Sequence, residues 1–170
     1  GESYDLAMYF AARHTLTDSM QRRKKRGYFF MTGDEPPFPK TSNSIVKSLL
    51  GTDLERDLPL ETVVDELSCN YHPFFLIPDL GRRNVEAVWR SYMGDNVIVL
   101  ESPQDTCRAT AGLVALCEGL VQDMDDLAAR LINRGSNPDQ VGRIVRALSP
   151  FAATLDRDGS GRVPVEGVAP

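Results

Sequence analysis

The sequence predicts an α/β fold, a Rossmann-like parallel sheet flanked by helices on both faces. Three short runs, at 28–31, 74–77 and 97–100, are apolar throughout, as is typical of strands that are covered on both faces. Segments with helical periodicity separate these runs, and that alternation favours a parallel sheet with right-handed crossovers. Three strands are few for such a sheet, so we expect further strands from upstream sequence or from a partner.

The first third of the chain supplies a helix, a basic segment and the first strand. We expect the helix at residues 3–16, where apolar side chains cover much of the circumference. The basic run 22–26 suggests either a phosphate-binding or nuclear-localisation signal or a solvated connection, and we favour the connection because like-charged runs are usually exposed. The strand at 28–31 then ends at Thr32-Gly33-Asp34, and Pro36-Pro37 prevents a helix or ladder from restarting.

Helices and strands continue to alternate through the rest of the chain. A glycine or a proline closes several of these elements, and Ser149-Pro150 is expected to end the final helix. One helix is expected to be long, with an interruption at Gly119. The expected helices are 45–50, 60–69, 84–93, 104–131 and 138–148, and the expected strands are 72–77 and 96–101.

Composition narrows the classes of function. The net charge of -5 argues against a general nucleic-acid partner, and no apolar stretch is long enough for a membrane span. The cysteines are few and odd in number, which favours reduced thiols in a cytoplasmic, bacterial-type protein, and we expect Cys107 and Cys117 in the core. No N-terminal signal pattern is visible, and since the chain begins with Gly1 rather than Met, we expect a piece of a longer protein.

Motifs for catalysis are weak in this sequence. His14 and His72 have no metal-ligand spacing, and no nucleophile elbow, Walker loop or dinucleotide fingerprint occurs, so we expect a protein that is not an enzyme. The run Asp156 to Gly161 is similar to the first half of an EF-hand loop, but Gly167 occupies the twelfth position, where an acid is needed. We therefore interpret that run as a polar turn.

Asp34 is the strongest candidate site residue. It follows an apolar strand, and open α/β sheets bind ligands at the carboxyl ends of their strands. The loop Thr32-Gly33-Asp34-Glu35-Pro36-Pro37 resembles the third metal-site loop of von Willebrand factor A (VWA) domains, in which a hydrophobic strand leads into Thr-Asp-x-Pro-Pro. The helix start Glu2-Ser3-Tyr4-Asp5-Leu6-Ala7 resembles the helix after the second metal-site loop. The resemblance covers about residues 2 to 130.

This resemblance implies a VWA-like protein-interaction domain with a divalent-cation site. Asp34 is the one metal ligand that can be carried over, because the first loop, Asp-x-Ser-x-Ser, is absent and Gly33 is inserted before the acid. Since Mg²⁺ or Mn²⁺ needs several oxygen ligands, we expect weak or no cation binding by this chain alone. A turn acid that bonds its own loop is the alternative role for Asp34.

Two other functions remain open at this point. One is a Rossmann-like hydrolase with the strand-end carboxylates Asp34 and Asp79, and the other is a structural piece of a larger assembly. In the favoured interpretation the partner is a protein, either a separate one, the missing upstream half or a second copy of the chain. Residues 1–132 are then the C-terminal part of a VWA-like domain, 133–150 an extra helix and 151–170 a polar turn with a flexible tail.

Overall fold

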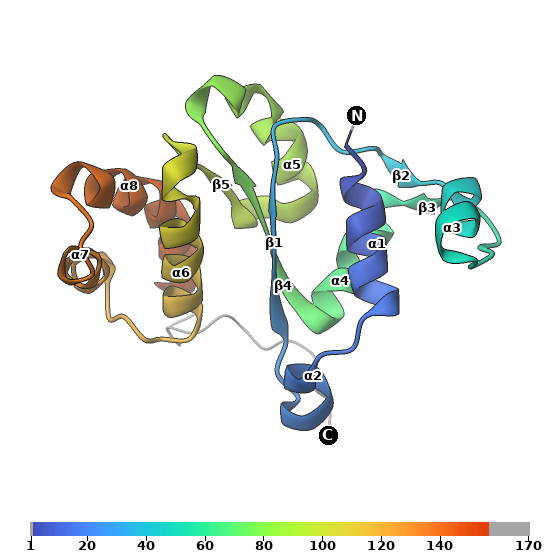
Figure 1. Cartoon of the computed structure of the whole chain (residues 1–170), viewed down its shortest axis with the longest axis horizontal. Coiled ribbons are helices and arrows are strands. Elements are labelled where there is room, and N and C mark those ends of the chain that lie inside the picture. The colour runs from blue at the N-terminus through green and yellow to red at the C-terminus, as the bar shows by residue number, and fades with distance from the viewer. Residues whose placement is uncertain (1, 157–170) are drawn as a thin grey trace. The chain divides into compact units, whose positions relative to one another are not determined.

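A computed structural model describes residues 2–156 as a mixed α/β fold, in which helices flank a three-stranded parallel sheet (Figure 1). The strands are β1 (Gly27–Thr32), β4 (Tyr71–Ile77) and β5 (Val97–Val99), in the order β1-β4-β5. The predicted α/β class is therefore confirmed. So is the prediction that the three apolar runs are neighbouring parallel strands.

The chain divides into two compact units. Unit 1 contains the residues up to Phe75 together with Asn84–Val97, and unit 2 contains Leu76–Arg83 and the residues from Ile98 onward. The boundary thus falls inside β4 and inside β5. Each unit has its own helices and its own buried side chains, and each is described by itself below.

Unit 1 contains a pair of packed helices and a short antiparallel pair of strands. In the first, α1 (Tyr4–His14) packs against α4 (Leu60–Asn70), and a bidentate ion pair joins Arg13 to Glu66 at 2.6 Å. In the second, the two-residue strands β2 (Lys40–Thr41) and β3 (Leu58–Pro59) pair with each other. Its other elements are α2 (Asp18–Arg23), α3 (Asn43–Leu50), α5 (Glu86–Met93) and the 3-10 turn η2 (Gly94–Asn96). The 3-10 turn η1 (Leu80–Val85) begins in unit 2 and leads into α5.

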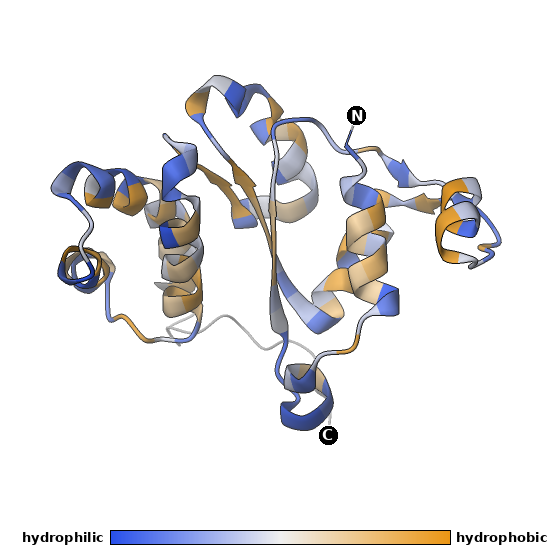
Figure 2. Ribbon diagram, in the orientation of Figure 1, coloured by the Kyte–Doolittle hydropathy of each residue, from blue (hydrophilic) through white to orange (hydrophobic). Residues whose placement is uncertain are grey.

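The two longer strands differ in how far they are buried. Residues 74–77 of β4 are almost completely buried, and hydrophobic residues mark this strand in Figure 2. In β1, by contrast, Tyr28, Phe29 and Phe30 are only half-buried and Met31 alone is buried. The prediction that this whole run is covered on both faces is therefore wrong. The reason is that β1 lies at the edge of the described sheet and pairs with β4 only.

In unit 2, α8 (Pro138–Asp156) packs against both α6 (Thr106–Cys117) and α7 (Met124–Asn133). The 3-10 turn η3 (Pro103–Asp105) precedes α6. Asp105 is buried at 1% exposure, and its carboxylate accepts hydrogen bonds from Arg143 at 2.7 and 3.1 Å and from Gln140 at 3.0 Å. The Arg143 guanidinium holds the pKa of Asp105 below its usual value.

One helix prediction is confirmed and another is wrong. The helix expected at 104–131 is interrupted at Gly119, as predicted: the chain leaves α6 through this glycine, whose φ of 63° is left-handed, and α7 begins at Met124. The last helix runs through Pro150 to Asp156 rather than ending there, and buried Phe151 and Leu155 extend its apolar face. Residues 151–156 are therefore helical, not part of a polar turn.

Two further expectations about helices are corrected. The basic segment contains a short helix, α2, which ends at left-handed Lys24; residues 22–25 are nevertheless exposed, as expected. Cys117 is buried as predicted, but Cys107 is exposed. Ten positions of an α-helix rotate the side chain by about 1000°, so these two cysteines point in different directions.

No helix among residues 2–156 has the length and apolar character needed to cross a membrane. The turn predicted at Asp156 to Gly161 lies outside the described residues beyond its first position.

Candidate functional site

The predicted site residue Asp34 lies in the loop that follows β1, at the carboxyl end of that strand. β1 ends at Thr32, whose side chain is exposed, while Asp34 and Glu35 are half-buried. The loop then passes through Pro36-Pro37 toward β2. The location expected from the sequence is therefore found, and the surroundings of the loop show what holds it in place.

The phenol of Tyr4, from the first turn of α1, contacts the backbone of this loop. Backbone groups of Asp34 and Glu35 hydrogen-bond to its hydroxyl, which in turn donates to the carboxylate of Glu2. Burial, reinforced by Glu2, raises the pKa of Tyr4 to about 12. A side chain on Gly33 would overlap the hydroxyl and would lie 2.7 Å from the ring carbon Cε1. The absence of a side chain at Gly33 therefore gives Tyr4 room to reach the loop.

The indole of Trp89 holds the same loop from α5. Its Nε1–H donates to the backbone carbonyl of Glu35 at 3.0 Å. Trp89 is completely buried and stacks on Phe75 of β4, with ring centroids 3.8 Å apart. Tyr4 meets both rings edge-on, at 5.3 and 5.4 Å. Three aromatic side chains from two helices and the sheet thus fix the backbone on which Asp34 is carried.

The acidic groups at this loop do not by themselves complete a cation site. Asp34 and Glu35 are adjacent in the loop, and the Tyr4 hydroxyl links the carboxylate of Glu2 to the loop backbone. Within residues 2–156, however, no group of three or more His, Cys, Asp or Glu side chains is arranged to hold a metal ion. A hard cation such as Mg²⁺ prefers six oxygen ligands and keeps some as water, so further protein oxygens would have to come from elsewhere.

Asp79, the other strand-end carboxylate, belongs to unit 2 and is used within its own turn. Its Oδ1 accepts the backbone N–H of Gly81 at 2.8 Å, the bond of an Asx turn. The two histidines are part of aromatic contacts: His72 stacks on Tyr28 at 5.4 Å, and His14 stacks on Phe10 at 5.6 Å.

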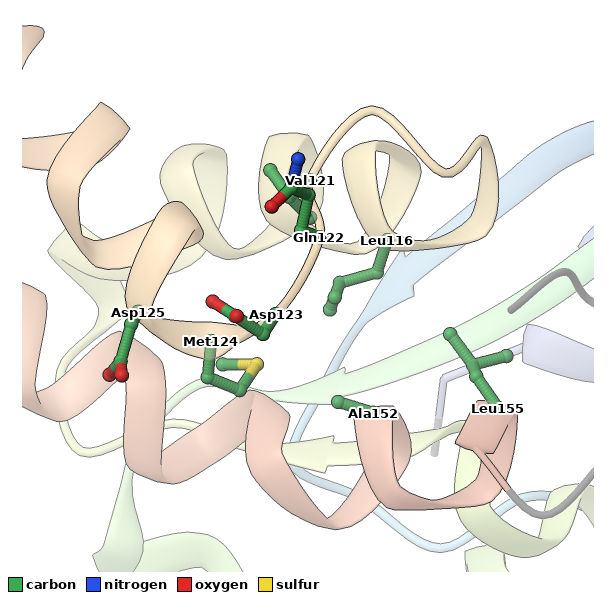
Figure 3. Close-up of a pocket in the computed structure, with 8 residues that line it drawn as sticks. All are labelled: Leu116, Val121, Gln122, Asp123, Met124, Asp125, Ala152 and Leu155. Carbon is green, nitrogen blue, oxygen red and sulfur yellow. The ribbon is translucent and has the colours of Figure 1, made fainter. Parts of the chain in front are cut away.

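A hollow of about 370 Å³ lies within unit 2, between the α6–α7 connection and α8 (Figure 3). Asp123 and Asp125 are the acids in its lining, and Asp123 caps α7 by accepting the N–H of Asp126 at 2.8 Å. Both acids therefore have a structural role at the start of α7, Asp123 as its cap and Asp125 in its first turn. The lining residues are Leu116, Val121, Gln122, Asp123, Met124, Asp125, Ala152 and Leu155.

Sequence reasoning found Asp34 but missed the residues that support it. Tyr4 and Trp89 were assigned only to helices, although a tyrosine or tryptophan on a buried helix face usually needs a polar partner for its O–H or N–H. That requirement is the one signal in the sequence that points to the network. It does not say which of the many backbone groups is the partner.

No protein-family model, curated protein or solved structure matches the chain. The resemblance to VWA domains therefore stays a prediction based on the loop and on the helix start.

Proposed function

We propose that this chain is part of a VWA-like domain that binds a protein partner through the loop carrying Asp34. The observation that carries the proposal is the fixed backbone of that loop, which Tyr4 and Trp89 both hydrogen-bond. An acid on a rigid support at the end of a parallel strand is well suited to recognition, because its position is set before the partner arrives.

A divalent cation, Mg²⁺ or Mn²⁺, takes part in this recognition, with ligands from outside the described residues completing its coordination. Asp34 contributes one carboxylate, directly or through a bridging water. One carboxylate gives weak affinity, since Mg²⁺ gives up its waters reluctantly. The chain alone is thus expected to bind the cation weakly.

Paramagnetic broadening by Mn²⁺ tests this role, because it detects weak sites. In a titration followed by amide NMR, we expect Mn²⁺ to broaden the signals of residues 33–35 first, and Asp34→Asn to remove that preference. Asp65→Asn is the matched control, since Asp65 is an exposed acid on α4. Broadening that begins elsewhere, or that is the same in Asp34→Asn, would contradict the proposed site.

Partner binding is tested by cross-linking in the cells from which the protein comes. Wild type and Asp65→Asn should give the same cross-linked protein, and Asp34→Ala should lose it while keeping the thermal unfolding curve of wild type. Identical cross-linked products from wild type and Asp34→Ala would refute the proposed function.

Of the other two functions, only the structural piece of a larger assembly is favoured by a specific observation. β1 presents half-buried aromatic residues at a sheet edge, and an apolar edge strand is a template for an added strand. An upstream segment or a second copy could supply that strand, and light scattering over a range of concentrations tests the second copy. The hydrolase with Asp34 and Asp79 gains no such support, since Asp79 bonds its own turn.

A further inference from the structure

A group of exposed cations, the basic patch, closes α2 in unit 1: Arg22, Arg23, Lys24 and Lys25. Figure 2 shows α2 as mostly hydrophilic. Arg22 forms only a distant pair with Asp18, at 3.8 Å, and both side chains are largely exposed, so this pair has little strength. Within residues 2–156 no acid forms an ion pair with the other three cations. Four like charges thus lie together almost without a counter-charge from the described part of the chain.

Arg26, the next residue, fixes the patch to the rest of unit 1. Its guanidinium donates to the backbone carbonyl of Ser68, near the C-terminal end of α4, at 3.1 Å. This bond holds the chain where it enters β1. The position of the patch is therefore set by the fold, which lowers the entropy that is lost when a partner binds.

The backbone at Lys24 is not what a simple connection needs. Its φ of 55° is left-handed, the one positive φ outside glycine in residues 2–156. The N–H of Lys24 bonds to the carbonyl of Met20 at 3.2 Å and that of Lys25 to Ser19 at 2.9 Å, as in a Schellman cap. Glycine is usual at this position, because a Cβ destabilises a left-handed backbone. The chain thus has a cation where glycine would be more stable, and such outliers are concentrated at functional positions.

Leu16 presents an apolar side chain to solvent at the other end of α2. It is 83% exposed and lies between two threonines that fix its backbone. The hydroxyl of Thr15 donates to the carbonyl of Ala11 at 2.6 Å, and the hydroxyl of Thr17 accepts the N–H of Met20 at 3.3 Å. Leu16 and Met20 also line a small hollow of about 40 Å³. The fold therefore holds an apolar side chain in solvent close to four cations.

We propose that the basic patch and Leu16 together bind a short acidic segment of a protein partner that also carries an apolar residue. The carboxylates pair with the cations through charge-assisted hydrogen bonds, and the apolar residue covers Leu16. Since α2 has six residues, about 9 Å separates its ends, a distance that three extended residues span. This surface goes beyond the proposed function, because it does not use Asp34, which follows the other end of β1.

The charge of the remaining chain favours a short segment over an extended polyanion. The net charge is -5, so the chain without the four positive charges of the patch carries -9. A nucleic acid or an anionic membrane extends past the Debye length of about 8 Å from the patch and would meet this acidic remainder. A short segment that ends at the patch would not.

The probe is the peptide acetyl-Leu-Gly-Ser-Glu-Asp-Glu-amide, with a neutral counterpart in which glutamine and asparagine replace the acids. In amide NMR of the full chain, the acidic peptide should shift signals chiefly in residues 15–25. The neutral peptide should bind about tenfold more weakly, because it lacks the charge-assisted bonds. Arg23→Gln combined with Lys25→Gln should weaken the acidic peptide by a similar factor.

Controls separate the patch from net charge and from the first proposal. Arg56→Gln combined with Arg134→Gln removes two positive charges from exposed positions outside the patch, and it should leave the affinity for the acidic peptide unchanged. Asp34→Ala should also bind this peptide as wild type does, so that failure at either site leaves the other one testable.

Two single variants test the apolar contact and the backbone. Leu16→Asn should weaken the acidic peptide, but not a version of it with glycine in place of leucine. Lys24→Gly removes one cation together with the unfavourable Cβ, so it should weaken the acidic peptide about threefold while raising the urea midpoint of unfolding.

Four results would overturn the basic patch as a site for an acidic segment. They are equal affinity for the acidic and neutral peptides, shifts concentrated outside residues 15–25, unchanged binding by the folded Arg23→Gln, Lys25→Gln variant, and an equal loss in the Arg56→Gln, Arg134→Gln control. Phosphatidylserine vesicles or single-stranded DNA that bind more tightly than the acidic peptide, and that the patch variant releases, would overturn it too, since the partner would then be a membrane or a nucleic acid.

Discussion

Replacement of Gly33 by alanine tests whether Tyr4 really fixes the loop that carries Asp34. The added methyl group would overlap the Tyr4 hydroxyl and lie 2.7 Å from Cε1, so either the ring or the loop has to move. Gly33 is not among the glycines with a left-handed backbone, so steric overlap rather than backbone strain is the cause.

The expected loss can be worked out from the contacts of Tyr4. Overpacking in a well-packed region costs about 1–3 kcal/mol. If the ring moves away, its hydrogen bonds to the loop, worth about 0.5–1.5 kcal/mol each, and its edge contacts with Phe75 and Trp89 are weakened as well. We therefore expect Gly33→Ala to lower the free energy of unfolding by about 2–4 kcal/mol.

Urea unfolding followed by tryptophan fluorescence is the assay, since Trp89 is the single tryptophan of the chain and lies in this cluster. In a Tyr4→Ala background the same Gly33→Ala change should cost less than about 0.5 kcal/mol, because the overlap is gone. Gly142→Ala is the control and should not destabilise, because Gly142 is helical and an added Cβ would meet only the flexible end of the Arg146 side chain, at 3.4 Å. An unchanged midpoint for Gly33→Ala, or an equal loss in both backgrounds, would refute the reasoning.

Two further predictions concern pH and the ion pair of unit 2. Since the pKa of Tyr4 is raised to about 12 in the folded chain, the stability that the neutral phenol contributes is complete below pH 10 and is lost as the pH rises from 10 toward 12. Alkaline unfolding that is unchanged in Tyr4→Phe would contradict this. Because Arg143 lowers the pKa of Asp105, the stability that this ion pair contributes is present at neutral pH and is lost as the pH falls through the folded-state pKa of Asp105. Asp105→Asn should therefore destabilise by on the order of 2 kcal/mol at pH 7, and thermal melts should show a difference from wild type that shrinks below pH 4, whereas a constant difference would count against the ion pair.

The sheet could be predicted from the sequence because its signal is local. The run at 74–77 is apolar at every position, and a run of that length between turn residues favours a strand that is covered on both faces. The half-buried state of Tyr28, Phe29 and Phe30 could not be predicted in the same way, since it depends on which strands are absent from the sheet's edge. Local pattern identifies a strand but not its neighbours.

The support of the candidate site depends on contacts between distant residues. Asp34 was identified from the strand that precedes it, whereas Trp89 reaches Glu35 across 54 positions of the chain. Pro150 shows the opposite case, in which a local rule predicted a helix end and burial of Phe151 and Leu155 overrode it. Tertiary packing decides both, and a single sequence does not reveal it.

The discontinuous course of unit 1 has a consequence for the chain as it leaves the ribosome. Phe75 ends the first segment of the unit, but Trp89, which stacks on it, lies in the second segment. Because translation adds about 5–20 residues per second, Phe75 emerges some 0.7–2.8 s before Trp89 does. Through that interval the apolar face of Phe75 is uncovered and the loop of Asp34 lacks one of its two supports, so the nascent chain exposes apolar surface when about half of it has been made.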